Sequence, residues 1–314
     1  MSTEGGTRAV VAALSANLGI AVLKFAAFAL TASSSMLAEA IHSVADSGNQ
    51  VLLLLGGRAS KRVATPEHPF GYGRERYIYA FVVSIVLFSV GGLFALYEAW
   101  HKAHEVAGHP HDLGQLDGRW WWVPLVVLIG AIVMEGLSLR TAVAEADRLR
   151  GEASWTEFVR RAKAPELPVV LLEDAAALLG LTFALFGVGL SLLTRSPVFD
   201  VIGTALIGLL LVAVAVVLAV ETRSLLIGEA AAPSVQDRIH AAVLGTDGVD
   251  GVIHMRTLHL GPEELLVGIK VAVAATDAAA EVAATIDRAE AAVRAAEPSA
   301  RVIYVEPDIL RPCD

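Results

Sequence analysis

Six long apolar segments constrain the fold of this 314-residue chain more than any other feature. A helix needs about 20 residues to cross about 30 Å of hydrocarbon. The segments span roughly 9–31, 36–57, 77–99, 120–140, 167–192 and 198–220. The first is too long for the apolar core of a signal peptide, so we expect it to remain as a span. Together with a mean hydropathy of +0.60, the pattern predicts a six-helix transmembrane bundle.

The charge balance and the cysteine content exclude several classes of function. The net charge of −9 comes without a basic stripe interleaved with aromatics, so nucleic acid is not an expected partner. The only cysteine is Cys313, so the chain has neither an intrachain disulfide nor a cysteine-based zinc site. The partners that we expect are membrane lipid and a divalent metal ion.

The distribution of lysine and arginine predicts the orientation in the membrane. The second and fourth connections between spans hold five and six of these residues, and the odd-numbered connections hold three in all. Positive charge marks cytoplasmic loops. We therefore expect both termini in the cytoplasm, and the composition favours a bacterial inner membrane.

A polar stripe runs along the second apolar segment. Glu39, His42, Asp46 and Asn49 follow each other at spacings of three, four and three, which places them on one helix face. An ionisable residue at membrane depth costs roughly 2.5–3.5 kcal/mol, so the stripe needs compensation. Either the stripe only hydrogen-bonds a neighbouring helix, or His42 and Asp46 hold a divalent cation between them.

Two adjacent carboxylates occupy the fifth apolar segment. Glu173 and Asp174 point about 100° apart on a helix, so both cannot face one point without bending of the side chains. We expect one of them to face the bundle interior, and the other to lie nearer an interface or to hydrogen-bond a neighbouring helix. Which of the two faces inward stays open.

Several further histidines have two interpretations. The connection at about 100–119 holds four of them, which either gather a metal loosely or are incidental in a solvated loop: His101, His104, His109 and His111. In the C-terminal region, His254 and His259 lie five apart on one expected strand and so face opposite sides. We interpret these two and His240 as ordinary surface or core histidines.

The composition changes after Val220, and the residues that follow predict a small soluble domain. We expect helices at 234–244 and 277–296, and strands at 252–260, 265–274 and 301–306. This αββαβ order predicts a ferredoxin-like α+β domain. The expected division is a transport domain at 1–222 and a cytoplasmic domain at 223–314.

The motifs resemble those of the cation diffusion facilitator family of divalent-metal/proton antiporters. The resemblance is carried by ANLGIAVLKFAAFALTASSSMLAEAIHSVADSGNQ, HPFGYGRERY, LLEDAAALLG, FDVIGTALIGLLL and the αββαβ tail, and so covers nearly the whole chain. The LLED form of the fifth span is similar to a subgroup that includes a mitochondrial zinc exporter.

This resemblance implies a metal site shared by spans two and five. His42, Asp46 and Asp174 match ligand positions, whereas Val170 stands where many zinc members have histidine. Glu173 or water would then complete an oxygen-rich site, with Glu39 and Asn49 lining it. We expect Zn²⁺ as the transported ion, and Mn²⁺, Fe²⁺ or Co²⁺ as alternatives.

The resemblance implies weaker metal sites elsewhere. His68 matches one ligand of a second site between spans two and three, but Tyr72 replaces another. In the C-terminal domain the positions of a binuclear zinc centre carry poor ligands: Ile253, Ile269, Tyr304 and Glu306. We therefore expect this domain to act mainly in forming a homodimer.

The predicted function is efflux of a divalent cation in exchange for protons, by alternating access. Metal ligands must be deprotonated, so loading expels a proton, and His42 is the expected proton carrier. Two other classes compete: an intramembrane metalloenzyme, and a membrane metal sensor or scaffold without transport. The spans carry neither HExxH nor GxSxG, so we expect no enzyme.

Overall fold

The structure, a computed structural model, describes residues 4–31, 34–108 and 121–311. These residues form two compact units. The first unit comprises residues up to Arg58 together with Arg76–Arg223, and the second comprises Ala59–Glu75 together with the residues from Ser224 onward. The expected division at 222/223 lies close to the later of these boundaries, but residues 59–75 pack with the second unit rather than with the spans.

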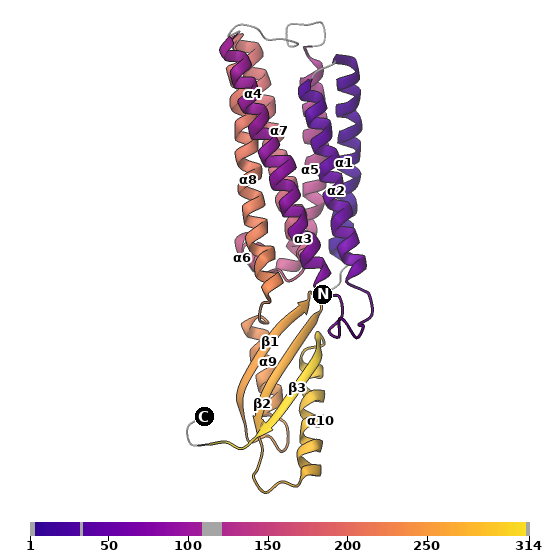
Figure 1. The fold of residues 1–314 in the computed structure, drawn as a ribbon, viewed down its shortest axis with the longest axis vertical. Helices are drawn as coiled ribbons and strands as arrows, with labels where there is room; N and C mark the ends of the chain where they lie inside the picture. Colours follow the sequence, from indigo (N-terminus) through magenta and orange to yellow (C-terminus); the bar gives the residue numbers. More distant parts are fainter. Residues whose placement is uncertain (1–3, 32–33, 109–120, 312–314) are drawn as a thin grey trace. The chain divides into compact units, whose positions relative to one another are not determined.

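The first unit is a bundle of long helices that run side by side (Figure 1). In chain order the elements are α1 (Glu4–Thr31), α2 (Ser34–Ala59), α3 (Glu75–Val86), η1 (Leu87–Leu93), α4 (Phe94–Gly108), α5 (Val123–Arg150), α6 (Trp155–Arg161), α7 (Glu166–Thr194) and α8 (Val198–Ile227). The third predicted span is the continuous run α3–η1–α4, whose middle turn is a π-helix. The helices extend beyond the apolar segments because they also include the charged residues at the segment ends.

Length and composition qualify several of these helices to cross a membrane. Within the described residues, four segments meet both criteria: Glu75–Gly108, Val123–Arg150, Glu166–Thr194 and Val198–Ile227. Asn17–Ala26 of α1 forms a shorter apolar stretch. In the bundle, α5 packs against α1 and α7, and α1 also packs against α7.

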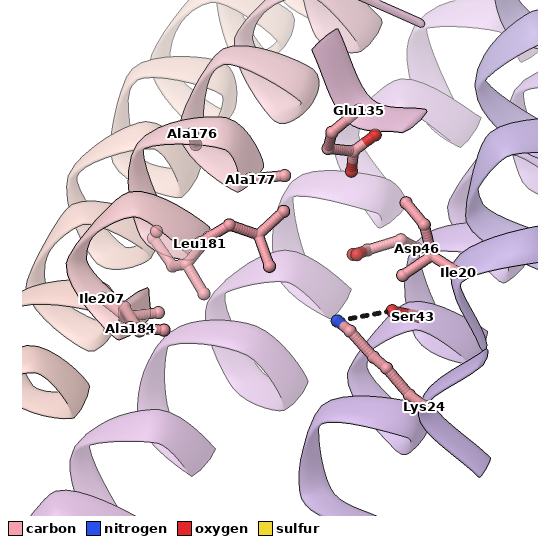
Figure 2. A pocket seen from close by; sticks show the side chains of 12 residues that line it. Ile20, Lys24, Ser43, Asp46, Glu135, Ala176, Ala177, Leu181, Ala184 and Ile207 are labelled. Atoms are coloured by element: carbon pink, nitrogen blue, oxygen red, sulfur yellow. Dashed lines mark hydrogen bonds between the residues drawn. The ribbon is translucent and has the colours of Figure 1, made fainter. Parts of the chain in front are cut away.

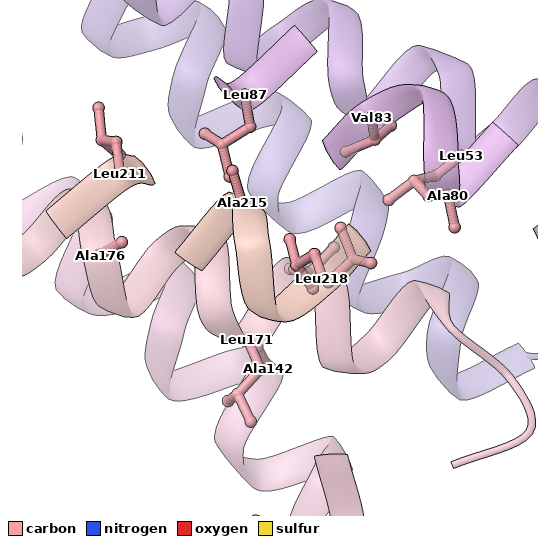
Figure 3. Packing of buried hydrophobic residues seen from close by; sticks show 12 residues of the cluster. Leu53, Ala80, Val83, Leu87, Ala142, Leu171, Ala176, Leu211, Ala215 and Leu218 are labelled. Carbon is pink, nitrogen blue, oxygen red and sulfur yellow. The ribbon is translucent and has the colours of Figure 1, made fainter. Parts of the chain in front are cut away.

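A cluster of aliphatic side chains joins α2, α3, α5, α7 and α8 (Figure 3). Leu53, Val83, Ala142, Leu171 and Leu218 are among its members, and all five are buried. Lipid is as apolar as these side chains, so close van der Waals packing rather than the hydrophobic effect holds such helices together. The cluster therefore fixes the helices that carry the polar residues described below.

Glycines allow the closest approach between α7 and α8. A Cβ built on Gly187 would lie 3.0 Å from the carbonyl oxygen of Phe199, and one on Gly203 would lie 3.0 Å from that of Phe183. Any larger residue at either position would push the two backbones apart, as at other small-residue helix contacts in membranes. Gly189, two residues further along α7, has no neighbouring atom within 4 Å of its Cβ position among the described residues.

The second unit is a three-stranded sheet with helices. Its elements are α9 (Pro233–Leu244), β1 (Gly251–Gly261), β2 (Glu264–Ala272), α10 (Ala279–Ala296) and β3 (Ala300–Asp308). The strand order is β1-β2-β3, with β1 and β2 antiparallel and β2 and β3 parallel. This is the αββαβ order that the sequence predicts.

Residues 59–75 contact the β1–β2 hairpin of the second unit. A Cβ on Gly73 would lie 2.8 Å from the carbonyl oxygen of Leu260 and 3.1 Å from the Cα of Gly261. Only glycine lets the two backbones approach this closely. The GYGR segment is therefore shaped to fit the hairpin.

Candidate metal site in the transmembrane bundle

A hydrogen-bonded contact joins the polar stripe of α2 to α7. The Asn49 side-chain amide donates to Glu173 Oε1 at 2.9 Å, and that of Gln50 donates to Glu173 Oε2 at 3.3 Å. All three side chains are buried. Gln50 also accepts a hydrogen bond of 3.3 Å from Asn17 on α1. Both oxygens of Glu173 are thus occupied by amides, which hold α2 against α7.

Asp174 makes a different contact, although it is the neighbour of Glu173. Ser138 on α5 donates a hydrogen bond of 2.6 Å to Asp174 Oδ2, and only 1% of Asp174 is exposed. The two adjacent carboxylates therefore face different helices, as their angular separation requires. Both are buried, and each accepts hydrogen bonds from a neighbouring helix, Glu173 from α2 and Asp174 from α5.

A cavity of about 30 Å³ lies beside these contacts, between α1, α2, α5, α7 and α8. Its polar lining consists of Lys24, Ser43, Asp46 and Glu135, whereas α7 and α8 contribute small and aliphatic side chains. Figure 2 shows Asp46 and Glu135 facing the same space, with Lys24 donating a hydrogen bond of 2.9 Å to Ser43. The space is large enough for one or two waters or an ion.

Glu135 is the residue of this region that the sequence analysis missed. It lies in the middle of α5, in the run AIVMEGLSL, and 3% of it is exposed. The sequence alone marks Glu135 as a functional candidate, because a single carboxylate in an otherwise apolar span is unusual.

Four carboxylates share this part of the bundle. Glu135 and Glu173 each interact electrostatically with Asp46 and Asp174. Among the side chains that the structure describes, no group of three or more histidine, cysteine or carboxylate residues is close enough to hold a metal ion. Glu39 and His42 belong to α2, but their side chains lie outside the described set.

The peripheral histidine predicted from the loop between spans two and three has a local partner. His68 stacks on Tyr72 with 4.7 Å between ring centroids, and its Nδ1 lies 3.3 Å from the Tyr72 hydroxyl. The guanidinium of Arg62 lies over the Tyr72 ring, 4.2 Å from its centroid. One ring nitrogen of His68 is therefore already hydrogen-bonded.

The histidines near the end of α4 belong to a helix rather than to the expected loop. His101 lies 3.6 Å from Glu105, and His104 Nδ1 lies 2.8 Å from the Trp100 carbonyl oxygen. His109 and His111 lie outside the described residues. The loop prediction was wrong at this end because α4 continues to Gly108.

The second unit separates the other histidines. His254 is exposed, whereas His259 is 8% exposed, and its backbone N–H donates to the Glu229 carbonyl oxygen at 2.9 Å. His240 is exposed on α9. At two of the positions where the resemblance implies a binuclear zinc centre, Ile269 is a core residue and Glu306 pairs with Lys270 at 3.1 Å.

Comparisons with known proteins cover most of the chain. The chain is 34% identical over 259 residues to the mitochondrial proton-coupled zinc antiporter SLC30A9 of Xenopus laevis, a match over 81% of this chain and 44% of that protein. It is 28% identical over 264 residues to metal tolerance protein C4 of Arabidopsis thaliana, over 83% of this chain and 56% of that protein. The chain thus spans about half the length of these curated relatives.

A solved structure and a family model were also compared with the chain. A structure of the MamM C-terminal domain in a nickel form aligns with 26% of this chain and all of that chain, with 22% identity and a TM-score of 0.25. The model of the cation efflux transmembrane domain matches residues 10–227. This match spans more than half of the chain and includes every polar residue of the bundle described above. The chain is therefore a multi-pass membrane protein that belongs to the cation efflux family.

Proposed function

We propose that this protein is an antiporter that moves divalent cations, zinc first, out of the cytoplasm in exchange for protons. The observation that carries the proposal is a group of four carboxylates in one apolar bundle: Glu135, Glu173 and Asp174 are buried, and Asp46 and Glu135 line a cavity. Buried carboxylates at membrane depth are costly and mark ion pathways. Relatives named proton-coupled zinc antiporters, at 32–34% identity, support the same class of function.

Within this proposal the metal ligands are His42, Asp46 and Asp174. Ser138 orients Asp174 through its hydrogen bond, as outer partners of metal ligands commonly do. Glu173 was a further ligand candidate. Since both of its oxygens accept hydrogen bonds from amides, we assign it to holding α2 against α7. Asn49 then acts through Glu173, while Glu39 stays a predicted lining residue.

Proton exchange follows from the chemistry of these ligands. A metal binds neutral imidazole and ionised carboxylates, so loading releases protons and reprotonation on the other side weakens the site. Histidine titrates near neutral pH, which makes His42 the proposed proton carrier. Moving one net charge across the membrane costs about 2.3 kcal/mol per 100 mV, so exchange of one proton for one divalent ion would respond to membrane potential.

The donor set bears on the choice of metal. Val170 provides no ligand at the position one turn before Asp174, so the proposed site has one imidazole and several carboxylate oxygens. Zn²⁺ accepts such ligands, and oxygen-rich sites also suit Mn²⁺. We propose zinc as the substrate, with Mn²⁺, Fe²⁺ or Co²⁺ as alternatives.

The proposal includes an arrangement in the cell. Both termini face the cytoplasm of a bacterium, in line with the excess of lysine and arginine in the even-numbered connections. The transport domain is residues 1–222, and the domain at 223–314 pairs two copies of the chain into a homodimer. Cross-linking of the purified protein in detergent and in membranes tests the dimer.

Flux into proteoliposomes tests the transport function. The full chain is reconstituted with a metal-sensitive fluorophore inside, and Zn²⁺, Mn²⁺ and Fe²⁺ are supplied outside with an imposed pH gradient. We expect Asp46→Ala and Asp174→Ala each to reduce zinc flux at least tenfold, whereas Asp147→Asn, on the exposed end of α5, retains it. If Asp46→Ala carries all three metals as well as the unmutated chain does, the site assignment fails. Metal binding without flux against a gradient would instead indicate a sensor or scaffold.

A further inference from the structure

Glu135 has a buried carboxylate oxygen that the rest of the structure leaves unmatched. Its Oε2 is inaccessible to solvent and has no hydrogen-bond partner among the described residues. The side chain is 3% exposed and points into the cavity from α5 (Figure 2). A carboxylate that serves only to join helices would have its oxygens paired, as those of Glu173 are. The free oxygen of Glu135 therefore indicates that a ligand completes this position.

Asp46 provides a second carboxylate on the same cavity. It approaches from α2, opposite Glu135, and the two groups repel each other electrostatically. The Ser43 hydroxyl, one turn before Asp46 by sequence, adds a third oxygen to the lining. Two carboxylates, a hydroxyl and room for water are the donors that hard, partly hydrated divalent cations use.

Lys24 brings a positive charge to this group of oxygens. It is 3% exposed, its ammonium donates to Ser43 Oγ at 2.9 Å, and its charge attracts Glu135. A buried ammonium beside two carboxylates offsets part of their mutual repulsion when no metal is present. A divalent ion entering the cavity would also offset the repulsion between the two carboxylates, and Lys24 would repel that ion.

We propose that Asp46 and Glu135 form a second cation-binding position in this cavity, and that Lys24 acts as its built-in counter-charge in the ion-free state. This inference rests on the proposed transport function and adds a position between α2 and α5 that shares Asp46 with the proposed site. The position uses oxygen donors alone. It therefore serves hard ions such as Mn²⁺ better than Zn²⁺, and Glu135 contributes to metal selectivity.

The first test compares two glutamates of the same helix in proteoliposome flux. Glu135→Gln keeps the size of the side chain but removes its charge, and Glu145→Gln makes the same change where the carboxylate pairs with Arg148. We expect Glu135→Gln to raise the KM for Mn²⁺ about tenfold or more, with a smaller change for Zn²⁺, and Glu145→Gln to change neither. Glu135→Asp, which restores a carboxylate, should recover part of the Mn²⁺ affinity.

The second test examines the counter-charge. Lys24→Gln should lower the KM for Mn²⁺ several-fold and slow turnover, since nothing then repels the bound ion. The double variant with Glu135→Gln should return towards the unmutated KM. Elution of each variant as one species in size-exclusion chromatography confirms that it is folded. If Glu135→Gln is folded and its Mn²⁺ and Zn²⁺ kinetics match those of Glu145→Gln, the proposal is overturned.

A third variant separates this inference from the proposed function. Asp46→Ala abolishes flux if the protein is a transporter that uses Asp46, whatever Glu135 does. Loss of flux in Asp46→Ala together with unchanged kinetics in Glu135→Gln overturns only the second binding position. Undiminished flux in Asp46→Ala overturns both.

Discussion

Asn49 on α2 and Glu173 on α7 lie 124 positions apart in the chain and share a hydrogen bond of 2.9 Å inside the bundle. Both residues are almost fully buried, at 1% and 7% exposure. The polar stripe of α2 thus faces α7, and an amide–carboxylate contact fixes how these two helices meet. Any rearrangement of α2 relative to α7 during transport has to accommodate or break this contact.

Replacing Asn49 should weaken the bundle. Asn49→Leu removes the donor to Glu173 Oε1 and leaves a buried carboxylate oxygen unmatched, which costs about 1–3 kcal/mol. Thermal unfolding in detergent measures the loss. Ser47→Ala is the matched control, because among the described residues the Ser47 hydroxyl bonds within its own helix, to the Ser43 carbonyl oxygen. Equal destabilisation by both variants would argue that the contact between helices contributes nothing specific.

Ser138 should matter for metal affinity more than for folding. Its hydroxyl donates to Asp174 Oδ2 at 2.6 Å and so fixes the rotamer of a proposed ligand. We expect Ser138→Ala to raise the KM for zinc about tenfold, as loss of such outer partners does at other metal sites. Thr141→Val, three residues along α5, removes a hydroxyl that bonds only to the Leu137 carbonyl oxygen and should leave the KM unchanged. A similar KM in both variants would show that Asp174 needs no orienting partner.

The sequence predicts the secondary structure better than the partners of each polar residue. Apolar length locates the spans, and helical and strand spacing along residues 234–306 predicts the αββαβ order, because both depend on local spacing. The fit of Gly73 against the β1–β2 hairpin joins residues almost 190 positions apart, and no local spacing encodes it.

The candidate site shows the same division between local and distant information. The stripe on α2 was visible because four polar residues repeat at helical spacing. Glu135 has no charged neighbours at helical spacing, so only its place in an apolar run marks it as a candidate. The separate roles of Glu173 and Asp174 depend on which helices lie on either side of α7, and helix spacing alone leaves that choice open.

A histidine at position 170 should shift metal selectivity. Val170 is fully buried on α7, one turn before Asp174. Val170→His adds an imidazole there, which favours Zn²⁺ over Mn²⁺, so the ratio of zinc to manganese flux should rise several-fold. The larger side chain also costs about 1–3 kcal/mol of packing. Val169→His brings the same bulk about 100° away on the helix and should leave the ratio unchanged; a rise in both variants, or in neither, contradicts a metal-facing position 170.

An ion pair between α3 and α7 should be needed for stability. The guanidinium of Arg76 binds both carboxylate oxygens of Glu166, one of them at 2.8 Å, and both side chains are largely buried. Glu166→Gln leaves a mostly buried guanidinium without its carboxylate, which costs about 3–5 kcal/mol. Glu157→Gln breaks an exposed pair with Arg161 and should cost about 0.5 kcal/mol or less. Thermal unfolding of both variants in detergent gives the comparison, and equal losses would refute the importance of the buried pair.

The second unit should show a pH-dependent contribution from an ion pair between β2 and β3. Lys270 lies 2.8 Å from Asp308, and this hydrogen bond lowers the pKa of Asp308 and raises the pKa of Lys270. A lowered carboxyl pKa stabilises the fold above about pH 3.9, the ordinary aspartate value, and the effect is lost as the pH falls through the folded pKa. A raised lysine pKa stabilises the fold below about pH 10.4, and the effect is lost as the pH rises through the folded value.

Asp308→Asn should therefore lower the urea midpoint of this unit most between about pH 5 and pH 9, because both charges of the pair are present there. The difference from the unmutated chain should shrink as the pH falls below about 4, because Asp308 is then protonated first in the unfolded state and, at a lower pH, in the folded state as well. Circular dichroism of the full chain in detergent follows the transition, with Asp287→Asn on the exposed face of α10 as the control.

Glu306 also contacts Lys270, at 3.1 Å, so part of the lysine's stabilisation survives in Asp308→Asn and is removed in Lys270→Met. A midpoint difference that is the same at pH 3 and pH 7 would contradict an ionic origin for this contact.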